Sequence, residues 1–599
     1  MRAVEAEMPS DAAAQRALNK KLSQIFRMRG LSVKPDAMQP LYDVLQGDEK
    51  WETTLQAVLH EVQNQDLPGG NNVDAAAIKA AISCLRQRVS HKPTLPLEVI
   101  DAFSMPLPRF DKQRRALVAE PSSPSLHAPA SAKGGAHALR LAMVEQRVRR
   151  HPMFKPPVLS NGVAPQEYLE ITGIDALLGR GGTRVILGML AEAEEGVFCI
   201  EDAHASIEVD LSDAACTPGL FTRHATVLAE GEVLPSGVFK VHQLGLPPHE
   251  PKQKSTESLG GLDLLHPSVT ADGSPTSVLS APAADSARGR SASGAASAAA
   301  AASLAAETAT GASSGSGLAR KRSAAATKAA EIALQNAWLV VLSDVWLDSK
   351  DVLGQLATLF AGYEAVGSEM VGNGKSAVPR AAFFTFVLCG NFTSSALAPP
   401  AAHGSQLKLE FAKLAALLAQ TPVLAQHAHF VLVPGPNDPS IGPADVLPRA
   451  PLSRHLTSEL QAALGHLELA SSPCRMLLCG QTVVVHREEL LVKARRACVL
   501  PPDTSGGYSL NQHLIKSVVD QAHLCPLPQS EAAVYWQLDH SMWLHPAPDV
   551  LVLCDRQPQF QHTYEETIGI NPGAFASDLS WFVYRPETRE AEPSSLEAA

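Results

Sequence analysis

Several oxygen-bearing side chains occur directly after short hydrophobic segments in the C-terminal half of this 599-residue chain. The residues with this placement are Asp344, Asn391, Asn437 and Asp438. In open α/β sheets, ligands bind just beyond the carboxyl ends of the strands. Carboxylates at such positions could hold divalent cations, which activate water for attack on a phosphodiester.

The elements that must position these residues are hydrophobic segments with the length of buried strands. They are residues 338–343, 383–389, 429–433, 475–479, 482–486 and 549–554. Helical segments are predicted between several of them, around residues 350–361, 405–419 and 511–521. Strands that alternate with helices favour a layered α/β sheet, and we assign residues 338–590 to one such domain.

The strand-end pattern resembles that of the calcineurin-like metallophosphoesterases. In that family the strand ends carry Asp-x-His, Gly-Asp, Gly-Asn-His-Asp/Glu and Gly-His-x-His, and these residues hold two metal ions. In this chain Trp346 replaces the histidine of the first motif, and Asn391 replaces the aspartate of the second. In the third motif, Pro436 and Asn437 stand where asparagine and histidine are needed.

The fourth motif aligns with residues 554–557, where Asp555 and Gln557 stand in place of the two histidines. Only Asp344 and Asp438 remain as hard anionic ligands, and two carboxylates without a histidine make a poor dinuclear site. The sequence therefore predicts an inactivated phosphoesterase-like domain with no catalytic residue, metal ion or cofactor. We expect the Trp346 indole to fill the cavity that a metal ion would occupy.

A second unit, residues 166–250, is rich in short β-type segments separated by turn signals. The segments are residues 183–190, 196–202, 205–211, 225–234 and 236–245. Five short strands in about 80 residues are typical of a small OB-type barrel. Residues 180–250 contain four basic and eleven acidic residues, a net charge of −7, and three phenylalanines as their only aromatic residues. Single-strand binding needs a positive groove with aromatic platforms, so we expect weak intrinsic DNA binding.

The remaining segments differ in composition. Residues 1–90 contain four amphipathic helical stripes and are predicted to form a helical docking domain. Residues 91–165 are rich in proline and are predicted to be an extended connector. Residues 251–337 are rich in Ala, Ser and Gly and are predicted to be disordered, with Arg320-Lys321-Arg322 as a candidate import signal or a solvated charge run. Residues 591–599 are expected to form a tail.

Overall composition limits the classes of function. The net charge is −11, from 61 acidic and 50 basic residues, which argues against a protein that mainly wraps duplex DNA. The nine cysteines include no Cys-x-x-Cys pair, so neither a disulfide framework nor a zinc ribbon is expected. No secretory signal and no run of 18 strongly apolar residues is visible, which predicts a soluble intracellular protein without a membrane span.

An OB-type barrel followed by a phosphoesterase-like domain without its ligands resembles the B-subunits of the replicative DNA polymerases alpha, delta and epsilon, and the epsilon type most. The resemblance depends on blocks of sequence spread over most of the chain. These include residues 185–189, 228–231, 245–248, 342–348, 360–363, 388–392, 433–439, 472–475, 521–527 and 570–575. Residues 1–90 also resemble the N-terminal domain of this family.

The resemblance implies a multidomain α+β protein with no activity of its own, an accessory subunit in nuclear DNA replication. In this family the barrel and the phosphoesterase-like domain hold the C-terminal zinc-binding region of the DNA polymerase epsilon catalytic subunit. The N-terminal domain links the polymerase to the GINS component of the replicative helicase. DNA contact is then expected only within the assembled complex.

The sequence leaves two alternative functions open. The chain could be an active metal-dependent phosphodiesterase or nuclease, which metal analysis and an assay of turnover would reveal. It could instead be an OB-type single-strand nucleic-acid binder, for which the barrel would need tight, salt-sensitive affinity.

Overall fold

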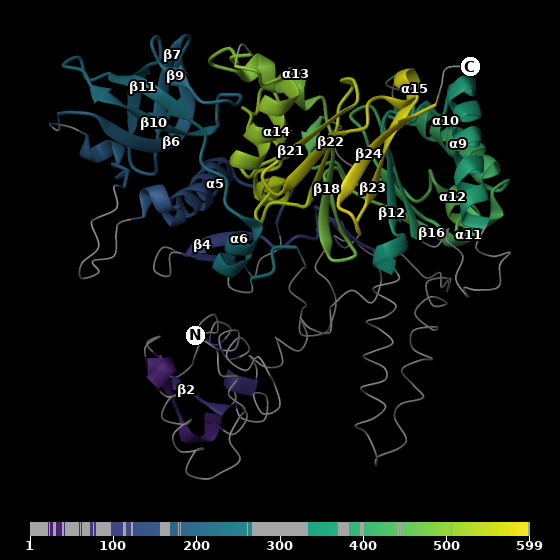
Figure 1. The fold of residues 1–599 in the computed structure, drawn as a ribbon, viewed down its shortest axis with the longest axis horizontal. Helices are drawn as coiled ribbons and strands as arrows, with labels where there is room; N and C mark the ends of the chain where they lie inside the picture. The colour runs from purple at the N-terminus through teal and green to yellow at the C-terminus, as the bar shows by residue number, and fades with distance from the viewer. Residues whose placement is uncertain are drawn as a thin grey trace.

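Two stacked β-sheets form the centre of the C-terminal domain in the computed structural model (Figure 1). The first sheet contains, in spatial order, β16 (His466–Leu469), β14 (His429–Val433), β13 (Phe384–Cys389), β12 (Trp338–Leu342), β23 (Ser580–Arg585) and β24 (Glu590–Ser595). The second contains β21 (Phe560–Tyr564), β22 (Thr567–Asn571), β20 (Val550–Cys554), β18 (Gln481–Arg487), β17 (Cys474–Leu478) and β3 (Leu97–Asp101). The six strands expected from the hydrophobic runs are therefore present, with ends that differ by at most one residue.

Both faces of each sheet are covered, which explains why these strands read as continuous hydrophobic runs. Val341, Val387 and Val485 belong to the core between the two sheets. The outer face of the first sheet packs on α9 (Lys350–Ser368), α10 (Pro400–Leu418), α11 (Pro422–His427) and α12 (Ser458–Ala463). The outer face of the second packs on α13 (Leu490–Ala497) and α14 (Leu510–Asp520). The result is a sandwich of helices, two sheets and helices.

The barrel forms from β6 (Arg184–Glu194), β7 (Val197–Glu201), β8 (Ser206–Asp210), β9 (Ala215–Cys216), β10 (Thr226–Val233) and β11 (Phe239–Gly245). Strand β10 pairs with both β6 and β11, and β11 pairs with β8, so the sheet closes on itself. Gly231 lies at the bulge in β10, where a Cβ atom would come within 2.0 Å of the Lys240 carbonyl oxygen. The five predicted strands of the barrel are confirmed.

Hydrogen bonds attach the barrel to the two-sheet domain. The Gly219 and Leu220 amides donate to His513 Nδ1 at 2.8 Å and Ser517 Oγ at 2.7 Å on α14. The Gln521 side chain both accepts from the Thr226 amide and donates to the Thr226 carbonyl. Because these contacts are buried and include backbone groups, the barrel and the sandwich form one connected body.

The structure corrects the extended connector predicted for residues 91–165. Strand β3 pairs with β17, β4 (Pro108–Asp111) pairs with β5 (Ala116–Ala119), and α5 (Ser131–Arg150) is a 20-residue helix. Met143, Val144 and Val148 of α5 pack against barrel and sandwich residues alike. The helix lies beside both of these parts of the molecule (Figure 1). The sequence did not predict α5 because the segment around it is rich in proline and the helix has few apolar side chains. The packing of α5 also depends on contacts with both neighbouring domains.

Two further boundaries also differ from the sequence prediction. Helix α6 (Lys252–Leu259) and the buried Leu264 give order to the beginning of the segment predicted to be disordered. Strand β24 includes residues 590–595, so most of the predicted tail is an edge strand paired with β23. A strand at a sheet edge needs only one paired side, and its alternating polar residues gave no hydrophobic signal.

The structure describes residues 97–111, 116–120, 124–155, 168–177, 179, 181–259, 262–265, 333–368, 383–395, 400–439, 443, 445–504 and 506–596, and in the N-terminal unit residues 22, 24–27, 31–38, 41, 55, 59, 62, 72–75 and 77–79. In this last group, Leu22, Phe26, Leu41, Leu59 and Ile78 belong to one buried cluster, as the amphipathic stripes predict. A short parallel pair, β1 (Ser32–Val33) with β2 (Asn72–Val73), was not predicted. The candidate import signal 320–322 and most of the 251–337 insert lie outside the described residues.

Candidate functional site at the strand ends

Asp344 follows β12 closely and is completely buried. Its backbone has φ of 52°, in the left-handed region, which is uncommon for a residue with a Cβ atom. The carboxylate accepts hydrogen bonds from Arg487 Nη2 at 2.9 and 3.1 Å and from Asn391 Nδ2 at 3.1 Å. The side chain that most resembles a metal ligand is therefore fully engaged by protein donors.

Arg487, the last residue of β18, supplies the cation of this site and is 0% exposed. Its guanidinium also donates to the Gly390 carbonyl at 2.7 Å, the Cys554 carbonyl at 3.1 Å and Glu489 at 2.9 Å. Burial lowers the pKa of Arg487, but the carboxylates of Asp344 and Glu489 outweigh burial and hold this pKa above its ordinary value. One guanidinium thus joins strand ends from both sheets.

Asn391 and Asp438 connect the loops that follow β13 and β14. Asp438 accepts from the Phe392 amide at 2.9 Å and from the Gly435 amide at 2.7 Å, while Asn391 Oδ1 accepts from the Asn437 amide at 2.8 Å. A Cβ atom on Gly390 would come within 1.8 Å of Asp438, so this glycine is required sterically. Burial raises the pKa of Asp438 to about 6. The hydrogen bonds of these residues hold the loops after β13 and β14 together.

Asp555 and Gln557 lie after β20 and make separate contacts. Asp555 Oδ2 accepts from the Leu491 amide at 3.0 Å, and the backbone carbonyl of Gln557 accepts from Asn571 at 3.0 Å. Burial and the neighbouring Glu489 raise the pKa of Asp555 to about 7. A carboxyl group with this pKa is a weak ligand for a hard cation at neutral pH.

Trp346 is half-buried and packs at the edge of the core between the first sheet and its helices. The guanidinium of Arg556 lies over its ring at 5.9 Å, and Arg556 Nε lies 3.4 Å from Asp344. The expectation that the indole takes the place of a metal ion stays a prediction. The groups that contact the Asp344 carboxylate are guanidinium, amide and hydroxyl groups.

The arrangement brings Asp344, Asn391, Asn437 and Asp438 together, as the sequence predicted. No group of three or more His, Cys, Asp or Glu side chains is placed to hold a metal ion anywhere in the described ranges. Sequence reasoning missed Arg487, although it follows a hydrophobic run directly and is followed by Glu488 and Glu489. A basic residue at a buried strand end, with acidic neighbours, is the signal that could have revealed it.

Comparisons with known proteins identify the family. The B-subunit family of DNA polymerases alpha and epsilon matches residues 339–562, the DNA polymerase epsilon subunit 2-like OB-fold domain matches residues 130–248, and the DNA polymerase epsilon N-terminal family matches residues 14–85. DNA polymerase epsilon subunit 2 of Homo sapiens is 30% identical to the chain, over 98% of this chain and 99% of its own length. The chain belongs to the DNA polymerase epsilon B-subunit family.

Other relatives agree with this assignment. The B-subunit of DNA polymerase epsilon from Arabidopsis thaliana is 30% identical over 96% of this chain and 98% of its own length, and the one from Schizosaccharomyces pombe is 28% identical over 86% and 79%. A solved archaeal phosphodiesterase covers 43% of the chain and 99% of its own length at 12% identity, but its TM-score of 0.22 is too low to support an argument. Membership of the epsilon B-subunit family places the chain in DNA replication.

The described helices also bear on membrane contact. None of them combines the length and the apolar character that crossing a bilayer requires.

Proposed function

We propose that this chain is a non-catalytic accessory subunit of DNA polymerase epsilon, which holds the C-terminal zinc-binding region of the catalytic subunit. The observation that carries the proposal is the ion pair of Arg487 with Asp344, which fills the strand-end site from within. A metal-dependent phosphoesterase needs a metal-bound hydroxide at such a site. The conclusion is that the domain acts as an inactivated phosphoesterase-like scaffold.

Electrostatics of the strand ends support this proposal. A divalent cation beside Asp344 would have to displace a fully buried guanidinium that donates to four different acceptor groups. Displacement would leave the Gly390 and Cys554 carbonyls without those donors, at a cost of about 1–3 kcal/mol for each buried group. The active phosphodiesterase or nuclease alternative is therefore disfavoured.

The barrel surface gives the single-strand-binding alternative little support. Arg223 pairs with Glu192 at 2.8 Å, and Lys240 pairs with Asp213 at 2.9 Å. Cations that are already paired release fewer counterions when they meet a phosphate backbone, so their contribution to affinity is small. We therefore propose that the chain contacts DNA only within the assembled complex.

The connection between barrel and sandwich suits a subunit that grips a partner. Arg147 on α5 donates to the Pro248 carbonyl at 3.1 Å and to the Asp520 carbonyl, and Arg140 pairs with Asp539 at 2.5 Å. Burial lowers the pKa of Arg147, although the carboxylates of Asp520 and Glu250 favour its charged form. A surface built across two fixed domains keeps its shape when a partner binds.

The N-terminal unit is proposed to link the polymerase to the GINS component of the replicative helicase, in the nucleus. Among the described residues, its buried cluster contains only residues from Leu22 to Ile78, with partly buried neighbours from the same unit. A small unit with its own core can dock independently of the larger body.

The proposal is tested by affinity purification of the tagged full-length chain from nuclear extract, followed by mass spectrometry. We expect the polymerase epsilon catalytic chain at equal stoichiometry, together with GINS components. A Phe26→Asp substitution in the N-terminal cluster should remove GINS and retain the catalytic chain, while Phe26→Leu should retain both. Absence of the catalytic chain from the wild-type sample would contradict the proposal.

A further inference from the structure

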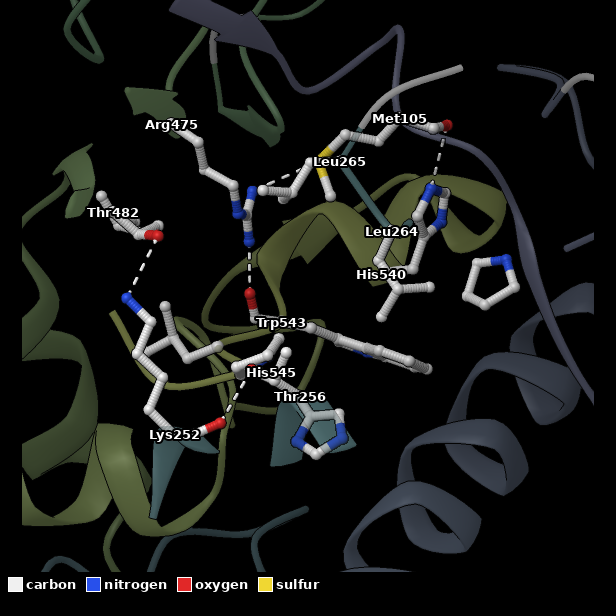
Figure 2. Close-up of a pocket in the computed structure, with 14 residues that line it drawn as sticks. Met105, Lys252, Thr256, Leu264, Leu265, Arg475, Thr482, His540, Trp543 and His545 are labelled. Carbon is white, nitrogen blue, oxygen red and sulfur yellow. Dashed lines mark hydrogen bonds between the residues drawn. The ribbon is translucent and has the colours of Figure 1, made fainter. Parts of the chain in front are cut away.

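A small cavity lies beside β17 and β18, where α6 and residues 540–546 cover the second sheet (Figure 2). Its volume is about 160 Å³, and the residues that give it its chemical character are Met105, Lys252, Thr256, Arg475, Trp543 and His545. A cavity of about 150 Å³ in a protein core can hold a benzene molecule. Drug-sized ligands need about 300–1,000 Å³, so this cavity suits one benzene-sized group.

Much of the wall is apolar. Leu264 and Leu265 line the cavity from the chain after α6, and Val484 and Leu544 line it from β18 and the loop after residue 542. An apolar wall of this kind favours an aromatic or branched aliphatic group, because transfer of such a group from water is favourable.

Arg475 is a charged lining residue beside this apolar wall, and it is 4% exposed. Its Nη1 donates to the Ser541 carbonyl at 2.6 Å. Nη1 also contacts the Met105 sulfur at 3.3 Å, and Nη2 donates to the Trp543 carbonyl (Figure 2). All three acceptors are neutral. Among the ion pairs of the described residues, none includes Arg475, so its positive charge has no carboxylate partner there.

Neighbouring groups do not supply the missing negative charge. The Lys252 ammonium forms an ion pair with Asp549, which engages that carboxylate. Burial lowers the pKa of His540 to about 4 and the pKa of His545 to about 3, so both rings are neutral near pH 7. Burial also lowers the pKa of Arg475 to about 10, which leaves it cationic at pH 7. The cavity therefore carries a buried positive charge beside apolar walls.

We propose that this cavity binds a carboxylate carried on an apolar group of about benzene size. The carboxylate neutralises Arg475, and the apolar group fills the space lined by Leu264 and Leu544. A charge-assisted hydrogen bond to a guanidinium is roughly twice as strong as a neutral one, which selects an anion over its neutral analogue. A free small molecule and the C-terminal residue of a peptide can both supply this chemistry.

The test uses the full-length chain and ligand-detected NMR with two probe pairs. Benzoate and benzamide represent the free molecule, and a hexapeptide with a C-terminal phenylalanine, as free acid or as amide, represents the peptide. We expect at least one carboxylate probe to bind about tenfold more tightly than its neutral partner, as a charged hydrogen bond predicts. The pair that shows this preference identifies the source. Failure of both carboxylates to bind, or equal binding of the neutral partners, overturns the proposal.

Two substitutions on α6 locate the binding. Thr256 is exposed and lines the cavity, so Thr256→Trp should block it and weaken the carboxylate probe at least about tenfold. Gln253 is exposed on the same helix and is not among the lining residues, so Gln253→Trp is the matched control and should retain binding. Unchanged affinity in Thr256→Trp would place the probe elsewhere and overturn the proposal.

Arg475→Met tests the charge itself and should abolish the preference for the carboxylate. If this variant does not fold, the two α6 variants decide the outcome, because an exposed position tolerates substitution.

Discussion

Arg487 and Arg475 are buried arginines on neighbouring strands, and their surroundings differ in one respect. Arg487 on β18 meets the carboxylates of Asp344 and Glu489, whereas Arg475 on β17 meets only neutral acceptors. The first charge is neutralised inside the protein, at the strand ends where we propose that the domain holds no metal ion. The second remains uncompensated beside a cavity. The difference shows that a buried guanidinium engages the carboxylates at the strand ends, whereas the buried charge on the other face of the same sheet is left for the carboxylate ligand that we propose.

The largest effect is expected from Arg487→Met. Removal of one partner from a buried ion pair leaves the fully buried Asp344 carboxylate with the half-exposed Arg556, 3.4 Å away, as its remaining cation among the described residues, which destabilises by about 3–5 kcal/mol. The free energy of unfolding from urea denaturation measures this loss. Arg585→Met is the matched control, since its pair with Glu592 is solvent-exposed and contributes about 0–1 kcal/mol. Equal losses in the two variants would contradict the role given to Arg487.

A smaller loss is expected from Arg475→Met. The Ser541 and Trp543 carbonyls lose their donor, which costs about 1–3 kcal/mol for a buried acceptor, but no carboxylate is left unpaired. The same denaturation experiment compares the two arginines directly. A loss as large as that of Arg487→Met would mean that Arg475 has a charged partner after all.

The pH dependence of stability should change in Asp555→Asn. The folded-state pKa of Asp555 is about 7 and lies above its ordinary value of 3.8. Below pH 3.8 the Asp555 carboxyl is protonated in both the folded and the unfolded state, so its ionisation does not lower the free energy of unfolding. As pH rises from 3.8 to about 7, Asp555 ionises more readily in the unfolded state than in the folded state, so the free energy of unfolding of the wild type decreases. Above pH 7 Asp555 is ionised in both states, and this loss of stability stays at its full value.

Asparagine does not titrate, so the difference in melting temperature between Asp555→Asn and wild type should increase in favour of the variant between these pH values. Above pH 7 the difference should stay constant. A difference that is the same near pH 4 and near pH 8 would show that the pKa of Asp555 is not raised in the folded protein.

The smallest effect is expected from Trp346→His, which restores the histidine of the first phosphoesterase-like motif. Arg487 still occupies the space beside Asp344, so equilibrium dialysis against Mn²⁺ should show no binding above the wild-type level. Stoichiometric Mn²⁺ in this variant would mean that the missing imidazole, and not the internal guanidinium, keeps the metal ion out.

Much of the sandwich could be predicted from sequence because its inner strands are buried on both faces. The runs at 338–343 and 429–433 are continuous and apolar for this reason. Strands β3 and β24 could not be found in this way, since β3 pairs with β17 across more than 370 positions and β24 is a polar edge. Helix α5 escaped prediction because its order depends on contacts with two domains.

The position of the candidate site could be predicted from the sequence, but the ion pair between Arg487 and Asp344 could not. Residue types alone predict that Trp346 and Asn391 do not supply the histidine and aspartate of the phosphoesterase motifs. The cation that pairs with Asp344 comes from β18, in the other sheet, and no local pattern links residue 487 to residue 344. Only the stacking of the two sheets brings these residues together.

We propose that an internal guanidinium occupies the strand-end site, so that this domain holds no metal ion there. Metal analysis of the full-length chain after dialysis against Mn²⁺ and Zn²⁺ tests the claim most directly. We predict a metal content far below one ion per chain, unchanged by Asp344→Asn. One or two ions per chain that are lost in Asp344→Asn would contradict the account.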